Sequence, residues 1–139
     1  MSRAVFIDTA GWLALINRQD QLHVQAVEVY RSLGNVGRVT TDAVLIETCN
    51  ALSKASLRPL AQAFMQKIKE AEKLGVLKVV HVTKDLLAEG WKLFKGRPDK
   101  EWSLTDCISF VVMRRRRCQK AFTSDQHFVQ AGFERLLQA

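Results

Sequence analysis

The residues best suited to do chemistry in this chain are four widely separated acids, Asp8, Glu47, Asp106 and Asp125. Each of them follows a segment expected to be a strand or lies within the first turns of an expected helix. If they converge, four carboxylates cannot all stay ionised side by side without a counter-charge. A hard divalent cation supplies that charge, and a ligand set made only of oxygen favours Mg²⁺ or Mn²⁺ over zinc.

Three of the acids also have a purely structural alternative. Residues 103–106 form a capping-box-like pattern, so Asp106 could reach back to the start of its own helix. Asp125 is an ordinary candidate for a helix N-cap. Asp8 could form a turn after an apolar strand, although Thr9 beside it can cap the next helix by itself. Taken singly, these three acids fit either reading.

Glu47 is harder to explain as a structural residue. It belongs to an expected helix that is largely apolar, with Val44 and Ala51 at the positions three before and four after it. A carboxylate on such a helix needs a partner when the chain folds. No Lys or Arg stands three or four residues away to provide one, which favours a functional role for Glu47.

The elements that must position these acids alternate along the chain. Apolar runs predict strands at residues 4–7, 38–41, 76–81, 121–123 and, as a last edge strand, 133–137. Helical spacing with caps and breakers predicts helices at residues 11–17 after a Thr9 cap, 21–33, 43–54 after an Asp42 cap, 59–74, 84–95 after a Thr83 cap, 103–117 and 126–131. This alternation predicts an α/β fold with a mainly parallel sheet and helices on both faces. Ligands of such sheets bind beyond the carboxyl ends of the strands.

Length and composition predict one domain covering residues 1–139. The chain has 139 residues, of which 47% are hydrophobic and 25% charged, as in soluble globular proteins. No apolar run approaches the roughly 18 residues of a membrane helix, and no secretory leader is evident, so we expect no membrane association and a cytoplasmic location. The net charge of +7 favours polyanionic partners without identifying one. The three cysteines, Cys49, Cys107 and Cys118, are expected to be reduced and buried.

Four segments, FIDTAGWLAL, TTDAVLIETCNAL, WSLTDCISFVVM and AFTSDQHFVQAGFERLL, together resemble the PIN-domain nucleases in order and spacing. The nearest likeness is to the VapC-type toxins of prokaryotic toxin–antitoxin pairs and their stand-alone relatives, over residues 5–137. Two departures, RRRRCQK where many relatives have a glycine turn and Ala10 where many have serine, concern the subgroup and not the acids. The resemblance places the family's acidic quartet on Asp8, Glu47, Asp106 and Asp125, with Thr9 and Thr123 as supporting hydroxyls.

The resemblance also implies a function. It implies a three-layer α/β/α fold and a Mg²⁺- or Mn²⁺-dependent endoribonuclease, usually dimeric, that leaves a 5′-phosphate and a 3′-hydroxyl. We expect Asp8 and Asp106 to bind the principal ion directly, Asp125 to bind it directly or through water, and Glu47 to hold the attacking water or a second ion. In toxin members a small antitoxin covers the site, often with a basic side chain among the acids. The alternatives are a stand-alone nuclease of RNA processing or decay, and a non-catalytic RNA-binding module.

Candidate RNA contacts are less sharply defined. Arg114 and Arg117 delimit a basic run at a helix end, where cations also complement the helix dipole. Lys100 and Trp102 precede the helix of Asp106, and Trp102 could stack on a base or anchor its loop to the core. His127 is near enough to Asp125 in sequence to approach the site, but the histidines show no ligand spacing and none is predicted to be catalytic.

Overall fold

The centre of the structure, a computed structural model that describes residues 4–139, is a five-stranded sheet in which every neighbouring pair is parallel. The strand order is β3-β2-β1-β4-β5. The strands are β1 (Val5–Ile7), β2 (Arg38–Thr41), β3 (Leu77–Val80), β4 (Lys120–Phe122) and β5 (Glu134–Arg135). The predicted parallel sheet of four to five strands is therefore confirmed, including the short edge strand at the end of the chain.

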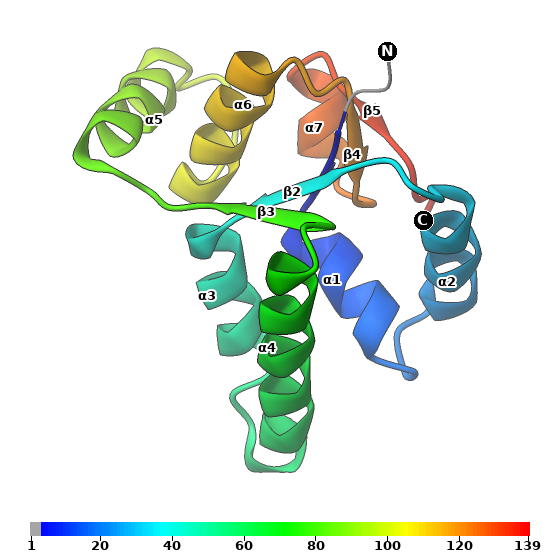
Figure 1. The fold of residues 1–139 in the computed structure, drawn as a ribbon. Helices are drawn as coiled ribbons and strands as arrows, with labels where there is room; N and C mark the ends of the chain where they lie inside the picture. The colour runs from blue at the N-terminus through cyan, green and yellow to red at the C-terminus, as the bar shows by residue number, and fades with distance from the viewer. Residues whose placement is uncertain (1–3) are drawn as a thin grey trace.

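Helices cover both faces of this sheet, as the alternating pattern predicted. They are α1 (Thr9–Ile16), α2 (His23–Ser32), α3 (Asp42–Ala51), α4 (Arg58–Lys73), α5 (Lys84–Gly96), α6 (Leu104–Arg116) and α7 (Gln126–Gln130), with a 3₁₀ turn at Ala55–Leu57. Helices α5, α6 and α7 lie on one side, and α1, α3 and α4 lie on the other (Figure 1). The three-layer α/β/α architecture is thus confirmed. Among the residues described, no helix is both long and apolar enough to cross a membrane.

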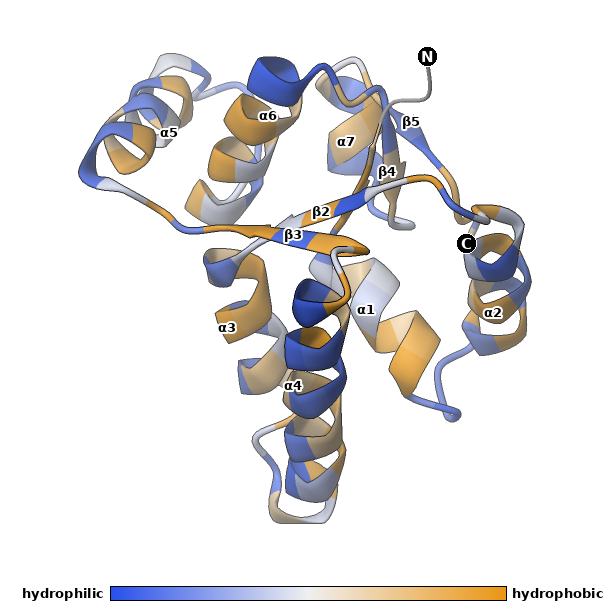
Figure 2. Ribbon diagram, in the orientation of Figure 1, coloured by the Kyte–Doolittle hydropathy of each residue, from blue (hydrophilic) through white to orange (hydrophobic). Residues whose placement is uncertain are grey.

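The core holds the helices that carry the acids against the sheet. Phe6 of β1, Phe110 of α6, Phe122 of β4 and Phe128 of α7 are fully buried. The Phe110 and Phe128 rings meet edge to face with their centroids 4.9 Å apart, an arrangement that aromatic quadrupoles favour. Figure 2 shows apolar residues on both the strands and the helices, and hydrophilic residues along the visible face of α4. These contacts fix α6 and α7 relative to β1 and β4.

Two helix caps differ from the prediction. Asp8, not Thr9, occupies the N-cap position of α1, and Thr9 is the first helical residue. Thr41, not Asp42, caps α3 by accepting a hydrogen bond from the Val44 backbone N–H at 3.1 Å. Asp42 instead accepts a bond from the Val82 backbone N–H at 2.9 Å. In both places the N-cap lies one residue earlier than predicted. The side chain of the predicted cap residue, Thr9 or Asp42, is therefore free to form a hydrogen bond with another part of the chain.

Candidate active site

The parallel sheet brings the ends of β1 and β4 together, and with them two of the acids. Ile7 of β1 is in register with Phe122 of β4. Asp8 follows the first of these residues, and Asp125 follows the second by three positions. The site therefore forms at the carboxyl edge of the sheet, where ligands of parallel α/β folds bind.

Thr123 joins Asp8 and Asp125 through a single buried hydroxyl. Its Oγ1 donates to Asp8 Oδ2 at 3.0 Å and accepts from the Asp125 backbone N–H at 3.1 Å. Thr123 is completely buried, and Asp8 is only 3% exposed. A hydroxyl can donate and accept at once, which is why threonine suits this position. The predicted supporting role of Thr123 thus has a direct geometric basis.

Burial makes Asp8 an unusual carboxyl group. Removal from water, and to a smaller extent the nearby charges of Asp106 and Asp125, raise the pKa of Asp8 from 3.8 to about 7. Hydrogen bonds from the Thr9 backbone and the Thr123 hydroxyl act in the opposite direction but are outweighed. Near neutral pH, ionisation of Asp8 in the metal-free site therefore destabilises the folded state. A bound divalent cation would balance the negative charge and remove this destabilisation.

Asp106 both caps its own helix and lies beside the other acids. With Ser103 it completes a capping box: Ser103 Oγ accepts from the Asp106 N–H at 3.0 Å, and Asp106 Oδ2 accepts from the Ser103 N–H at 3.1 Å. The side chain is nonetheless placed among the other acids, and its pKa is raised by burial first and by the charge of Asp125 next. The capping bonds position this carboxylate rather than exclude it from the site.

Asp125 shows the same combination. It is the N-cap of α7, where its Oδ1 accepts from the His127 backbone N–H at 2.8 Å. It is half-buried and close enough to raise the pKa values of Asp8 and Asp106 by its charge. These three acids therefore share one electrostatic environment.

Glu47 is joined to the cluster through Thr9. The Thr9 hydroxyl donates to Glu47 Oε1 at 2.6 Å, across the contact between α1 and α3. Thr9 directly follows Asp8, so this bond places the half-buried Glu47 carboxylate beside the same strand end. The partner expected for the Glu47 carboxylate is thus the neutral hydroxyl of Thr9. By this hydrogen bond Thr9 holds the Glu47 side chain in place.

His127 is the site residue that the sequence did not predict. Its Nδ1 lies 3.1 Å from Asp106 Oδ2 and 3.4 Å from Asp125 Oδ1. One ligand atom from each of Asp106, Asp125 and His127 falls within 4.8 Å of the others, close enough to share one metal ion. The available signal was its position in the first turn of α7, two residues after an acidic cap.

The donor set fits a hard divalent cation. Each acid accepts a hydrogen bond through one oxygen, Asp8 from Thr123, Glu47 from Thr9, Asp106 from Ser103 and Asp125 from His127. Within residues 4–139 no side-chain or backbone hydrogen bond engages the second oxygen of Glu47, Asp106 or Asp125. The carboxylates are thus fixed in place while keeping oxygen atoms available for an ion.

The candidate RNA contacts do not all reach this site. Trp102 is only 5% exposed, and its Nε1 donates to Gln130 Oε1 at 3.0 Å. Its ring packs edge-on against Phe110. Trp102 therefore anchors its loop to the core, the second of the two roles considered for it, and has no free face on which a base could stack. Lys100 is half-buried in the loop before α6.

The arginine run lies towards the other end of α6. At a rise of 1.5 Å per residue, Arg114 stands about 12 Å along the helix from Asp106, and Arg117 lies beyond the end of the helix as its C-cap. Arg115, between them, pairs with Glu89 of α5 at 2.7 Å. Any contact of Arg114 or Arg117 with RNA would therefore involve nucleotides away from the scissile bond.

Replacing Thr123 by valine is expected to lower activity roughly ten- to a hundredfold, because the isosteric side chain removes the hydroxyl that orients Asp8 and Asp125. Loss of the buried hydrogen bonds should also lower the free energy of unfolding by roughly 1–3 kcal/mol. Cleavage rates and urea unfolding would measure both effects. Thr123→Ser keeps the hydroxyl and should retain most of the activity, so equal losses in the two variants would contradict this role.

The chain is similar to known proteins both in sequence and in fold. The model of the PIN domain family matches residues 5–134. In two strains of Mycobacterium tuberculosis, the 23S rRNA-specific endonuclease VapC20 is 35% identical over 130 residues, covering 93% of this chain and 95% of the relative. The crystal structure of M. tuberculosis VapC20, described as a sarcin–ricin loop cleaving toxin, superposes with a TM-score of 0.82 at 33% identity, covering 94% of this chain and 96% of that one.

A more distant structure, VapBC2 from Rickettsia felis bound to a DNA fragment from its promoter, has a TM-score of 0.65 at 13% identity. It covers 94% of this chain and 96% of its own, and at that identity it supports the fold alone. The family match spans nearly the whole stretch from the first of the four sequence segments to the last. The chain belongs to the PIN-domain family.

Proposed function

We propose that this protein is a divalent-metal-dependent endoribonuclease that hydrolyses RNA phosphodiester bonds at the acidic site. The observation that carries the proposal is the convergence of Asp8, Asp106 and Asp125 at the carboxyl edge of the sheet, with Asp8 buried and its pKa raised. Mg²⁺ or Mn²⁺ there would polarise the phosphoryl group and lower the pKa of the attacking water. The protein supplies the fixed carboxylates and the low-dielectric surroundings.

Each acid has a role that its environment supports. Asp8 and Asp106 are the most buried and would bind the ion directly, whereas Asp125, half-buried, would bind directly or through water. Glu47 is less buried and is held by Thr9, which suits a carboxylate that orients the attacking water or holds a second ion. The stand-alone nuclease remains the second candidate function, since it would use the same acids in the same way.

For the substrate we propose a structured loop of large-subunit ribosomal RNA. The support is the 35% identity to a 23S rRNA-specific endonuclease over nearly the whole chain. A net charge of +7 also favours a folded RNA polyanion, and ribosomes would place the activity in the cytoplasm.

This substrate can be tested with a hairpin carrying the sarcin–ricin loop sequence and a second hairpin with that loop scrambled. We expect cleavage of the first hairpin in Mg²⁺ or Mn²⁺, none in EDTA, and weak cleavage of the second. Cleavage of both at equal rates would support a general RNA nuclease, and binding without cleavage in either metal would refute the enzyme.

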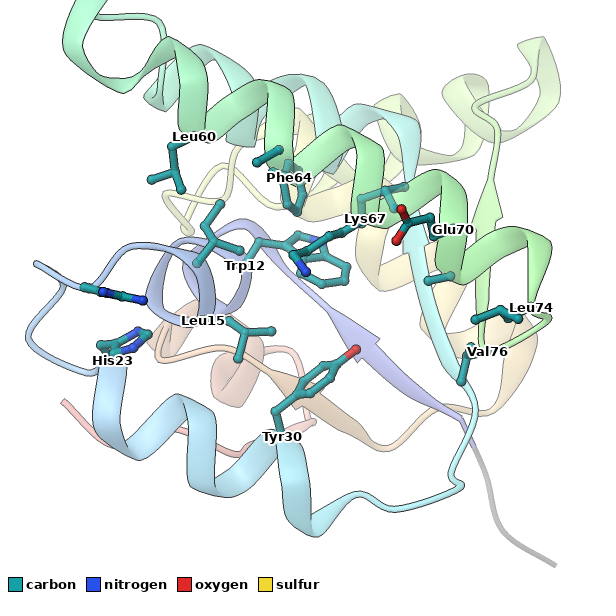
Figure 3. Close-up of a pocket in the computed structure, with 15 residues that line it drawn as sticks. Trp12, Leu15, His23, Tyr30, Leu60, Phe64, Lys67, Glu70, Leu74 and Val76 are labelled. Carbon is teal, nitrogen blue, oxygen red and sulfur yellow. The ribbon is translucent and has the colours of Figure 1, made fainter.

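A groove separate from the acids offers a place for an antitoxin. Helices α1, α2 and α4 enclose a space of about 610 Å³ lined largely by apolar side chains (Figure 3). Trp12, Leu15, Tyr30 and Phe64 point into it. We propose that a small antitoxin inserts an apolar segment here, next to α1, the helix that follows Asp8. The similar VapC20 is described as a toxin, which supports an antitoxin as the kind of partner.

Leu74→Glu is expected to weaken binding of such an antitoxin by about tenfold or more, because it places a charge in the apolar groove. Leu74 lines the groove and is 80% exposed, so the change should leave the fold and RNA cleavage intact. Val24→Glu is the matched control, since Val24 is 70% exposed on α2 but is not among the residues that line the groove. Calorimetric titration with the product of a short reading frame adjoining the gene would measure this binding; equal loss in both variants would contradict the proposed location.

A second exposed apolar surface suits a homodimer. Leu87, Trp91 and Phe94 on α5 are 45%, 48% and 39% exposed, and the two aromatic rings stack with centroids 5.4 Å apart. We propose that two copies pair through this face in a symmetric contact. Light scattering should give twice the chain mass for the wild type and the monomer mass for Trp91→Glu; an unchanged mass in that variant would exclude this face.

A further inference from the structure

Within the part of the chain that the structure describes, the imidazole of His127 is the one side-chain nitrogen group in contact with Asp106 and Asp125. Its side chain is 31% exposed, and its Nδ1 faces Asp106 Oδ2 and Asp125 Oδ1. Asp106 and Asp125 are the acids assigned above to the metal, so the imidazole lies at the position of a possible ligand.

The distances match the edges of a coordination polyhedron. Ligand atoms about 2.1 Å from an octahedral ion are separated by about 3.0 Å when adjacent and about 4.2 Å when opposite. Without an ion, the 3.1 Å contact between Nδ1 and Asp106 Oδ2 is a hydrogen bond. The Nδ1 distances of 3.1 and 3.4 Å to the two carboxylates are also those of adjacent ligand positions, so an ion could replace the bridging proton with little movement of the ring. All three ligand atoms lie within 4.8 Å of one another, within the span that one ion requires.

The backbone holds the ring in this position before any ion binds. The His127 backbone N–H donates to Asp125 Oδ1 at 2.8 Å. This bond holds the His127 backbone next to the carboxylate that its side chain also contacts. The next residue, Phe128, is fully buried and fixes α7 to the core. Little conformational entropy would therefore be lost if the imidazole became a ligand.

We infer that His127 supplies a nitrogen ligand, through Nδ1, to the ion held by Asp106 and Asp125. The site is then a mixed nitrogen and oxygen site, which selects Mn²⁺ and Co²⁺ over Mg²⁺ more strongly than four carboxylates would. This inference rests on the proposed function, because it presupposes an ion at the acidic cluster. It adds a specific ligand and a metal preference to that site.

Pulsed electron paramagnetic resonance of the Mn²⁺-loaded full chain tests the ligand directly, because a bound imidazole nitrogen produces a ¹⁴N modulation independent of catalysis. His127→Gln and His127→Asn remove the imidazole, and His81→Gln is the matched control. His81 also faces an aspartate, with its Nδ1 3.2 Å from Asp42 Oδ2, but it lies outside the acidic cluster. We expect the modulation in the wild type and in His81→Gln, and its loss in both His127 variants.

Calorimetric titrations of the same proteins with Co²⁺ and Mg²⁺ provide a second readout. Loss of a nitrogen ligand should weaken Co²⁺ binding about tenfold or more and Mg²⁺ binding much less. Equal weakening of both ions would overturn the inference, since His127 would then act only by orienting Asp106. Mn²⁺ binding by the wild type without ¹⁴N modulation would also overturn it while leaving the proposed nuclease site intact. Absence of any Mn²⁺ binding would refute the site itself.

Discussion

Asp8→Asn is expected to abolish metal-dependent RNA cleavage and, at the same time, to stabilise the metal-free protein at pH 8. Burial raises the pKa of Asp8 from 3.8 to about 7, so above that pH the folded state must hold a desolvated negative charge next to two other acids. A shift of about three pKa units corresponds to roughly 4 kcal/mol, as an upper figure for the cost of that charge. The neutral amide avoids this cost but cannot balance the charge of a divalent ion.

The pH dependence follows from the sign of the shift. Because the pKa is raised on folding, the contribution of Asp8 to stability is most favourable below about pH 4 and is lost as the pH rises through about 7. In EDTA, the stabilisation by Asp8→Asn should therefore be large at pH 8 and small at pH 4.5. Urea unfolding at the two pH values measures it.

The control for this experiment is Asp85→Asn, an exposed aspartate in the first turn of α5. It should change neither cleavage nor the pH dependence of stability appreciably. Added Mn²⁺ should stabilise the wild type by mass action and leave Asp8→Asn almost unaffected. A variant that retains cleavage, or that is less stable than the wild type at pH 8 in EDTA, would contradict the assignment of Asp8.

The second large effect is expected for Gly11→Ala in α1. A Cβ at Gly11 would lie 2.0 Å from the Phe122 backbone oxygen and 2.6 Å from the Phe122 ring. The backbone of β4 cannot move away without breaking the bond from the Asp8 N–H to that same oxygen. We expect the variant to lose roughly 3 kcal/mol of stability, at the upper end of the cost of overpacking, and to lose activity by displacing Asp8 from Thr123.

Gly96→Ala is the matched control, because Gly96 is also helical but a Cβ there meets nothing within 4 Å. That change should be neutral or slightly stabilising, as expected for alanine in place of glycine in a helix. Thermal unfolding and cleavage rates measured on both variants separate the two cases. Equal stability of Gly11→Ala and the wild type would show that α1 does not approach β4 as closely as described.

Much of the fold could be predicted because its signals are local. Short apolar runs, glycines after helices and the Thr83 and Ser103 caps identify strands and helices within a few residues, and alternation implies a parallel sheet. The caps of α1 and α3 were misassigned because Asp8 and Thr9, like Thr41 and Asp42, are both good capping residues. Which one caps depends on where the strand ends, and pairing with neighbouring strands determines that point.

The site was predictable only in part, because its geometry also depends on contacts between elements that are distant in the sequence. The positions of Asp8 and Glu47 were informative because an acid after an apolar run, or on an apolar helix, needs a tertiary partner. The sequence could not show that Asp106 both completes a capping box and lies among the other acids, since a capping residue and a site residue have the same local sequence. The proximity of His127 to Asp106 arises from the packing of α7 against α6, which no spacing within either helix reveals.

The most direct test of the acidic site is anomalous X-ray diffraction from crystals of the full chain soaked in Mn²⁺. The structure predicts one strong anomalous peak bounded by the carboxylates of Asp8, Asp106 and Asp125, with Glu47 at its edge. In Asp8→Asn crystals under the same conditions this peak should be weak or absent. A peak elsewhere on the wild-type protein, or none at these acids at saturating Mn²⁺, would contradict the account.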